Sequence, residues 1–393
     1  MKLLFIFCDM MRGTSLKLVN DSIHEYGPID TILKKLGGTV YTNCYTPAPD
    51  SPRSIACLYT GLYPKKNGCK KRIQWPKFYL DENSVTLFSL LIDNGYALFD
   101  NFRPVDIKVG IFPNGIEKIS RNCDGIIGLT DNVNKNADCN NLFAFLSLSD
   151  YHIAVNNRGP DFNSNIDGQI HISNAIKLFF DKIYPEFFDY IVIFSDHGCE
   201  FKEDAINDDI YKTCDPRTKI LMFIHKKGDT KIKKCSSLTS ILDVFPTLEE
   251  IIVGKIIHAS DGVSLFKPIE NRYIVIEDHS KFYPSIDCPH DLWAVRTETF
   301  FYLESLTKIS LLKIQPNHTY VKVKNIEKSY LDKFQKLLDT NSCSYTENKR
   351  QIEILKFYDE LNKEELDQKE YSDGQKIKKS LKTKIWNLVR KVR

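Results

Sequence analysis

The chain has 393 residues, of which 42% are hydrophobic; this is enough to fill the core of a large domain and excludes disorder over most of the length. Its 54 Lys and Arg residues nearly balance its 51 Asp and Glu residues, so we expect no nucleic-acid partner from composition. No segment approaches the roughly 20 consecutive apolar residues that a transmembrane helix needs.

The 11 cysteines contain no CxxC pair, which favours a reduced protein over a disulfide framework. The apolar run at residues 3–7 is too short for the core of a signal peptide and is typical of a buried first strand. We therefore expect a cytoplasmic protein.

Segments typical of strands alternate with segments typical of helices along the first part of the chain. They span residues 3–7, 29–36, 54–60, 85–94, 143–148, 172–183, 190–194 and 220–224. This alternation predicts an α/β fold with a mostly parallel central sheet that is covered by helices on both faces. Such sheets place their chemistry at the carboxyl ends of strands.

The pattern changes near residue 265. Segments 273–276 and 293–303 are typical of short strands in a smaller antiparallel unit, and the sequence from about residue 327 is charged and helical. We therefore predict an α/β catalytic domain at 1–265, an antiparallel subdomain at 266–326 and a helical region at 327–393.

The last 18 residues, from Lys376 to Arg393, have the pattern of a basic amphipathic helix. Apolar residues recur at helical spacing among eight Lys and Arg residues. Three interpretations stay open: a terminal helix packed on its own domain, an anchor to a membrane surface, or a segment that binds a partner or nucleic acid.

Two predicted strands end in side chains that bind metals. Asp9 follows the strand at 3–7, where an acid is either a metal ligand or a helix N-cap. The strand at 190–194 leads into Ser195, Asp196, His197 and a glycine that permits a tight turn. An adjacent carboxylate and imidazole form half of a site for Zn or Mn, although such a pair also occurs in purely structural roles.

A Pro-rich loop at 46–50 leads into a predicted helix. If the first turn begins at Pro52, Ser51 is the N-cap, and its hydroxyl lies at the positive end of the helix dipole. The free backbone N–H groups there bind anions. Capping alone explains a serine at this place, and a nucleophile is the alternative.

Together these segments resemble the sulfatase and alkaline phosphatase superfamily, in which an early acid, a nucleophile at a helix start and a late Ser-Asp-His-Gly recur. In the sulfatase branch the nucleophile is followed by Thr-Gly and a Pro. Here Thr60-Gly61 begins nine residues after Ser51 and Pro64 lies thirteen after it, so Ser51 occupies the nucleophile position. Weaker similarities continue to about residue 305, at segments 94–103, 145–152, 240–248, 261–265 and 293–297.

The resemblance implies an alkaline-phosphatase-like three-layer sandwich with a metal held by Asp9, Ser51, Asp196 and His197. Sulfatases usually have two acids after the first strand, whereas Asp9 is followed by Met10. In this respect the chain is similar to phosphonate monoester hydrolases and lipoteichoic acid synthases, which bind one Mn-like ion. We therefore expect one divalent metal ion, Mn, Zn or Ca, with Mn or Zn preferred.

The same resemblance bears on the reaction. Sulfatases convert a Cys or Ser to formylglycine, guided by a Pro and an Arg at the second and fourth positions after it. Here Pro52 and Arg53 are the first and second residues after Ser51. This favours an unmodified Ser51 and a phosphoester or phosphonate ester hydrolase or phosphotransferase. A sulfatase with formylglycine at position 51 is the alternative.

Other site residues follow from the resemblance. His152 is the expected general acid, Arg53 and Arg103 are expected to bind the ester oxygens, and Lys212 and Arg217 are weaker candidates for substrate binding. A second metal would need further ligands, for which the available residues have no convincing spacing: Asp161, His171, Asp278, His279 and His290.

The expected substrate is an anionic ester, such as a phosphorylated or sulfated glycan, lipid or small molecule. The basic C-terminal segment fits an enzyme that acts on a glycan or lipid-linked precursor at the inner membrane face. A catalytically silent protein that binds anionic glycans, or a membrane-surface scaffold, is the non-enzymatic alternative.

Overall fold

The central sheet is built around the first strand. The computed structural model describes residues 1–70, 80–81, 83–102, 121–206, 208–278, 291–315 and 319–346. Its main sheet has eight strands in the order β5-β4-β6-β1-β7-β8-β2-β9. Strand β1 pairs in parallel with β6 and β7, and β8 runs antiparallel to both of its neighbours. The strands are β1 (Lys2–Cys8), β2 (Gly38–Tyr41), β4 (Ala97–Asp100), β5 (Arg121–Asn122), β6 (Leu142–Leu148), β7 (Tyr190–Phe194), β8 (Met222–Lys226) and β9 (Ile232–Cys235).

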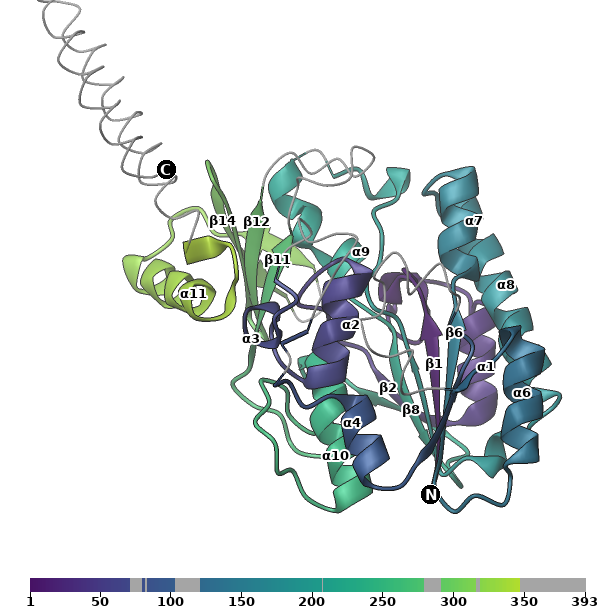
Figure 1. Ribbon diagram of the computed structural model, residues 1–393. Helices are drawn as coiled ribbons and strands as arrows, with labels where there is room; N and C mark the ends of the chain where they lie inside the picture. Colours follow the sequence, from purple (N-terminus) through teal and green to yellow (C-terminus); the bar gives the residue numbers. More distant parts are fainter. Residues whose placement is uncertain are drawn as a thin grey trace, which may run out of the picture. The chain divides into compact units, whose positions relative to one another are not determined.

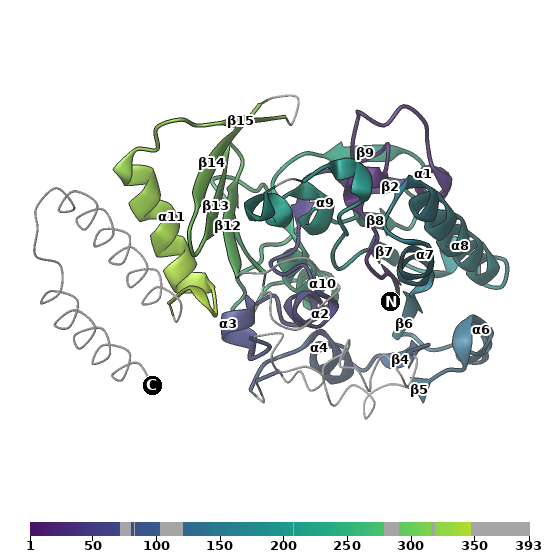
Figure 2. The same cartoon turned by 90° about the horizontal axis from the view of Figure 1, so that it is seen from above.

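Helices cover both faces of this sheet (Figures 1 and 2). One face carries α1 (Pro28–Leu36), α6 (Gly125–Lys135), α7 (Asp150–Arg158) and α8 (Phe162–Phe180), and the other carries α2 (Ser51–Thr60), α4 (Leu87–Asp93) and α10 (Val244–Val253). Because β1 is buried on both faces, its sequence is a continuous apolar run rather than an alternating one. The predicted three-layer α/β fold is confirmed.

Short elements connect these layers. They are η1 (Gly13–Ser15), α3 (Pro64–Asn67), η4 (Pro185–Phe187), η5 (Lys202–Asp204), η6 (Asp209–Thr213), α9 (Asp215–Thr218) and η7 (Ile241–Asp243), with a two-stranded parallel sheet formed by β3 (Cys44–Tyr45) and β10 (Thr239–Ser240). Helix α8 begins at Phe162, ten residues before the predicted start at 172. Asp161 accepts a hydrogen bond from the backbone N–H of Ser164 and so begins the helix ahead of its apolar repeat.

The predicted antiparallel unit is confirmed. Strands β11 (Tyr273–Asp278), β12 (Leu292–Thr297), β13 (Phe300–Ser305), β14 (Ile309–Ile314) and β15 (Tyr320–Lys322) form a five-stranded sheet, and α11 (Lys328–Asn341) packs on it (Figure 2). Phe334 of α11 is buried and stacks on Tyr302 of β13, with 5.1 Å between ring centroids. This contact fixes the helix to the sheet.

Residues Met1–Thr346 form one compact unit. The basic segment Lys376–Arg393, which the sequence assigns to an amphipathic helix, lies outside the described residues. None of the helices that the structure describes combines the length and the apolar character needed to cross a bilayer.

Asn101 extends the central sheet where β4 ends. Its side-chain amide donates to the carbonyl of Ser147 at 3.0 Å, and its Oδ1 accepts from the N–H of Ser147 at 2.7 Å. The last residues that pair between β4 and β6 are Asp100 and Phe145. The side chain of Asn101 continues this pairing to Ser147. It therefore holds the end of β6, which leads into α7.

We expect Asn101→Ala to lower the free energy of unfolding by about 2 kcal/mol, since two hydrogen bonds are lost and the partly buried N–H of Ser147 is left unpaired. Urea denaturation followed by circular dichroism measures this, with an unchanged m-value. Asn101→Asp places a second acceptor opposite the carbonyl of Ser147 and is expected to lose at least as much. An Ala variant within about 0.5 kcal/mol of the wild type would contradict this role.

Candidate functional site

Asp9 lies at the carboxyl end of β1 and is 1% exposed. Its N–H donates to the carbonyl of Leu148 at 3.0 Å, which continues the β1–β6 ladder by one residue. Its two carboxylate oxygens have different partners. Oδ1 accepts from the hydroxyl of Ser51 at 3.3 Å, and Oδ2 lies 2.8 Å from Nδ1 of His152.

Asp196 and His197 follow the neighbouring strand β7. Asp196 is fully buried, and its Oδ1 accepts from the N–H of Met10 at 2.9 Å. Nδ1 of His197 lies 2.7 Å from the carbonyl of Gly198, which can only accept, so Nδ1 carries a proton and Nε2 faces the two acids. That Nε2 lies 3.4 Å from Oδ2 of Asp196 and 3.3 Å from Oγ of Ser51.

Met10 has a backbone conformation that is rare for its residue type. Its φ is 62°, in the left-handed region, which costs a non-glycine residue about 1–2 kcal/mol. The conformation turns the Met10 N–H toward Asp196, while its side chain packs in the main hydrophobic core. The position where many sulfatases have a second acid is therefore occupied by a buried apolar side chain.

Ser51 is the first residue of α2, and the N-cap is Asp50. The prediction that Ser51 caps the helix is wrong by one residue, because the Asp50 side chain accepts from the N–H of Arg53 at 3.3 Å. Ser51 keeps the position at the helix start that the sequence predicted. Its hydroxyl lies between Asp9 and His197, 3.3 Å from each, and the residue is 7% exposed.

The carboxylates of Asp9 and Asp196 and the imidazole of His197 form a group that fits a divalent cation. One ligand atom of each lies within 4.8 Å of the others, and it is the one such group among the described residues. Oδ2 of Asp196 is buried and has no hydrogen-bond partner in the described part of the chain. An orphaned carboxylate oxygen beside a second carboxylate is costly unless a cation lies between them.

The ionisation of the two acids agrees with this interpretation. Burial raises the pKa of Asp196, and the negative charge of Asp9 raises it further. Burial also raises the pKa of Asp9, but His152, His197 and the hydroxyl of Ser51 outweigh it and hold the pKa below its ordinary value. A divalent cation would relieve the repulsion between both carboxylates.

His152 lies in the first turn of α7, directly after β6. Its side chain is 33% exposed, and its Nδ1 bonds to Asp9. The structure therefore brings His152 together with Asp9, Ser51, Asp196 and His197, five of the residues that the sequence singled out.

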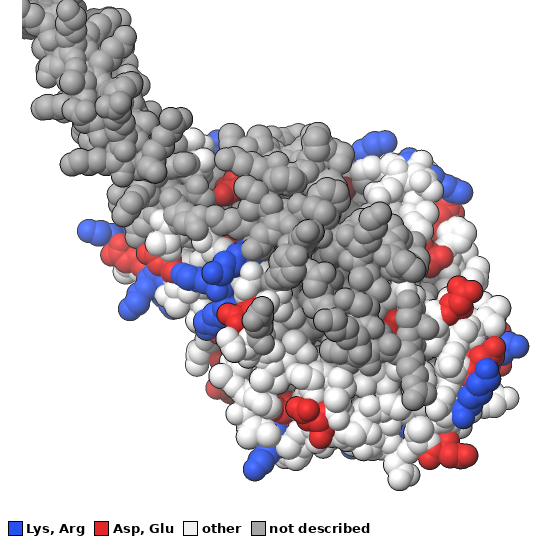
Figure 3. All heavy atoms as spheres, viewed as in Figure 1, with Lys and Arg blue, Asp and Glu red and all other residues white. Residues whose placement is uncertain are grey.

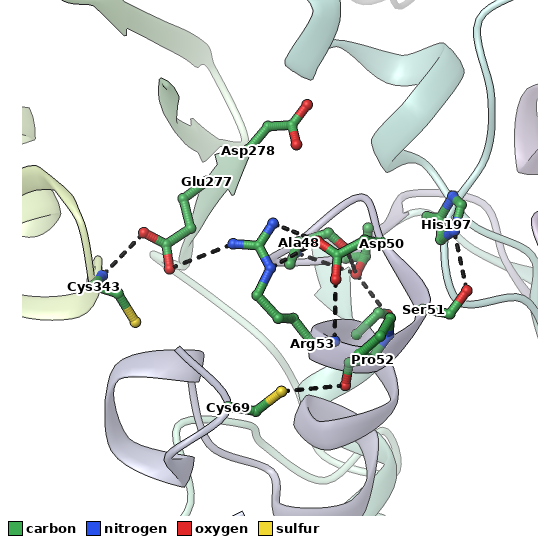
Figure 4. Close-up of polar contacts among 12 residues, drawn as sticks. Ala48, Asp50, Ser51, Pro52, Arg53, Cys69, His197, Glu277, Asp278 and Cys343 are labelled. Carbon is green, nitrogen blue, oxygen red and sulfur yellow. Dashed lines mark hydrogen bonds and ion pairs between the residues drawn. The ribbon is translucent and has the colours of Figure 1, made fainter. Parts of the chain in front are cut away.

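Three residues that the sequence predicts to bind substrate are buried in the structure: Arg53, Lys212 and Arg217. Arg53 is fully buried and pairs with Asp50 and Glu277, so its guanidinium has no exposed surface for a substrate (Figure 4). Arg217 pairs with Asp278 at 2.7 Å, and Lys212 is 7% exposed. In this arrangement Arg53 stabilises the start of α2.

Several further candidates do not join the site. Asp161 caps α8 and His171 is exposed on the same helix, so neither belongs to the acid and histidine group. Asp278 is the partner of Arg217. Arg103, His279 and His290 lie outside the described residues. The sequence analysis did not identify Asp50 and Glu277 as partners of Arg53. The three-residue spacing between Asp50 and Arg53, which places both on one side of a helix start, was a signal for the first of them.

Among the described residues that Figure 3 shows in colour, basic side chains lie close to acidic ones. Lys65 donates to the carbonyl of Asp339 at 2.5 Å, and Lys66 pairs with Asp261. These two lysines therefore bind other parts of the chain.

Neither a family model nor a curated protein matches this sequence. Solved structures do share its fold. A 2-O GAG sulfatase has a TM-score of 0.63 and 17% identity over 89% of this chain and 93% of that one. An alkaline phosphatase superfamily protein from Vibrio parahaemolyticus has a TM-score of 0.59 and 17% identity, covering 88% of this chain and 87% of that one.

The phosphonate monoester hydrolase of Agrobacterium radiobacter has a TM-score of 0.56 and 14% identity, with 90% of this chain and 95% of that chain covered. At these identities the similarity establishes the fold alone. The chain therefore has the fold of the sulfatase and alkaline phosphatase superfamily, as the resemblance of its sequence motifs implied.

We expect Asp196→Asn to weaken binding of Mn²⁺ or Zn²⁺ by more than about 100-fold, since even outer-shell partners are worth about 10- to 100-fold. Without metal, the variant should be at least as stable as the wild type at neutral pH. The raised pKa of Asp196 means that its contribution to stability is present in acid and is lost as pH rises through the folded-state pKa.

Calorimetric titration with MnCl₂ and thermal melts with and without metal between pH 4 and 7 measure both effects. Asp181→Asn, at the exposed C-terminal end of α8, is the control and should bind metal like the wild type. Unchanged metal affinity in Asp196→Asn would exclude this site.

Proposed function

We propose that the chain is a metal-dependent hydrolase or transferase of anionic esters in which Ser51 is the nucleophile. The observation that supports this most is the position of the Ser51 hydroxyl, 3.3 Å from both Asp9 and His197. Capping of α2 does not explain this position, because Asp50 is the cap and Ser51 instead lies beside two side chains of the kinds that bind metals, Asp9 and His197. The positive end of the α2 dipole would also favour the anionic part of a substrate.

The proposed metal ligands are Asp9, Ser51, Asp196 and His197. When bound, a divalent ion such as Mn or Zn would supply Lewis acidity toward the ester oxygens and lower the pKa of the serine hydroxyl. The chain itself fixes the ligands. The Met10 N–H orients Asp196, Gly198 sets the tautomer of His197, and α2 presents Ser51.

The proposed covalent step begins with loss of the Ser51 proton to solvent. Oγ forms a bond to phosphorus while the bond from phosphorus to the leaving oxygen breaks, and His152 gives that oxygen its proton. Water then hydrolyses the phosphoseryl ester, or an acceptor hydroxyl takes the phosphoryl group. Nδ1 of His152 faces Asp9, so Nε2 is the nitrogen that would carry the transferred proton.

A phosphoester or phosphonate ester is the preferred substrate. Unmodified Ser51 suits phosphoryl transfer, and the displaced Pro52 and Arg53 do not match the pattern that guides formylglycine formation. A sulfuric ester is the alternative, favoured by the fold shared with a sulfatase. A glycan or lipid-linked precursor at the inner membrane surface is the proposed setting. The roles of Arg103 and Lys212 in binding the ester stay predictions.

We expect Ser51→Ala to lower kcat at least about 1,000-fold on the best ester substrate, because the nucleophile is lost. Intact mass of the protein trapped with phosphate or sulfate ester substrates identifies the chemistry. One added phosphoryl group in the wild type, absent from Ser51→Ala, supports the proposal. Loss of two hydrogens at Ser51 would support the sulfatase alternative, and neither change with no turnover would contradict both.

Removal of metal should abolish the activity. We expect dialysis against EDTA to lower kcat/KM at least about 100-fold, a loss comparable to that of one oxyanion donor, and MnCl₂ or ZnCl₂ to restore it. Full activity in protein shown by elemental analysis to be free of metal would contradict a metal-dependent mechanism.

A further inference from the structure

A buried ion-pair network begins next to Ser51. Asp50 immediately precedes Ser51, and its Oδ1 caps α2 by accepting from the N–H of Arg53. Its Oδ2 accepts from Nε of Arg53 at 2.7 Å and from a second guanidinium nitrogen (Figure 4). The orientation of the Asp50 cap therefore depends on the Arg53 side chain.

The far side of the Arg53 guanidinium faces Glu277, at the end of β11. Its NH1 lies 3.9 Å from Oε1 of Glu277, and both side chains are buried, at 0% and 2% exposed. Burial opposes the charge of Arg53, but the carboxylates of Asp50, Glu277 and Asp278 raise its pKa above the ordinary value. Arg53 is thus held as a cation between two elements that lie far apart in the sequence.

Glu277 is itself fixed by the turn after α11. Its Oε2 accepts from the hydroxyl of Ser342, from the N–H of Cys343 at 2.9 Å and from the N–H of Ser344 at 3.4 Å. Its backbone N–H donates to the carbonyl of Pro47 at 2.9 Å, in the loop that leads to Ser51. One residue therefore joins the turn after α11 to both the loop and the helix that carry the proposed nucleophile.

We propose that Glu277 is a positioning residue for Ser51, acting through Arg53 and Asp50. This inference rests on the proposed function. If the charge of Glu277 is lost, the carboxylates of Asp50 and Asp278 still act on Arg53, but its guanidinium is no longer held from Glu277, and the Asp50 cap moves with it. Ser51 adjoins that cap, and a displacement of about 1 Å costs a nucleophile about 100-fold in rate.

Glu277→Gln tests the proposal because it keeps the size of the side chain and an acceptor for the turn at 342–344, and removes the charge. We expect kcat to fall about 10- to 100-fold, with KM and the affinity for Mn²⁺ changed less than about threefold. Hydrogen–deuterium exchange should rise in a peptide spanning residues 48–55. Ser342→Ala, which removes one support of Glu277, should change both readouts in the same direction by a smaller amount.

Glu304→Gln is the matched control. Glu304 lies on the same antiparallel sheet, is 2% exposed and accepts hydrogen bonds from Tyr345 at 3.1 Å and from Gln335 at 3.3 Å. It should lower thermal stability like Glu277→Gln but leave kcat and exchange at 48–55 unchanged.

Equal effects of the two variants on kcat and exchange would overturn the proposal, and so would wild-type exchange at 48–55 in Glu277→Gln. Exchange does not depend on turnover. A wild type with no esterase activity would therefore count against the proposed function, while the exchange comparison would still decide whether Glu277 positions Ser51.

Discussion

The site depends on the burial of two carboxylates at the same edge of a parallel sheet. Strands β1 and β7 pair with Phe7 opposite Phe194, so Asp9 and Asp196, each two residues further on, emerge side by side. Neither acid can be solvated there, since they are 1% and 0% exposed. The surrounding groups reduce their repulsion: the imidazole of His152 contacts Asp9, and the N–H of Met10 donates to Asp196. The imidazole of His197 lies near both acids, in a group that could hold a cation.

Much of the fold could be predicted from the sequence because its signals are local. Continuous apolar runs identify strands that are buried on both faces, and Asp9, Asp196 and His197 follow the ends of two such strands, whereas Ser51 begins a helix. The parallel arrangement then brings their carboxyl ends together without any long-range information. His152 reaches the same place for the same reason, since α7 follows β6 directly.

The features that were missed depend on contacts between distant segments. The surroundings of Arg53 are set by Glu277, which lies 224 residues further along the chain, so no local pattern distinguishes a buried partner from a substrate clamp. The antiparallel direction of β8 is also set by its pairing with β7 and β2, which the prediction of a mostly parallel sheet left open. The left-handed backbone of Met10 is invisible in sequence, because methionine does not favour that conformation.

The Met10 N–H has a consequence for how Asp196 can bind a metal. That hydrogen bond engages one of the two carboxylate oxygens, so in the proposed site Asp196 would offer mainly its other oxygen to a cation. Asp9 is restricted in a similar way by His152, which contacts one of its oxygens. If a cation binds there, few protein donors would hold it, and an incomplete set of protein ligands is what separates a reactive metal centre from a structural one.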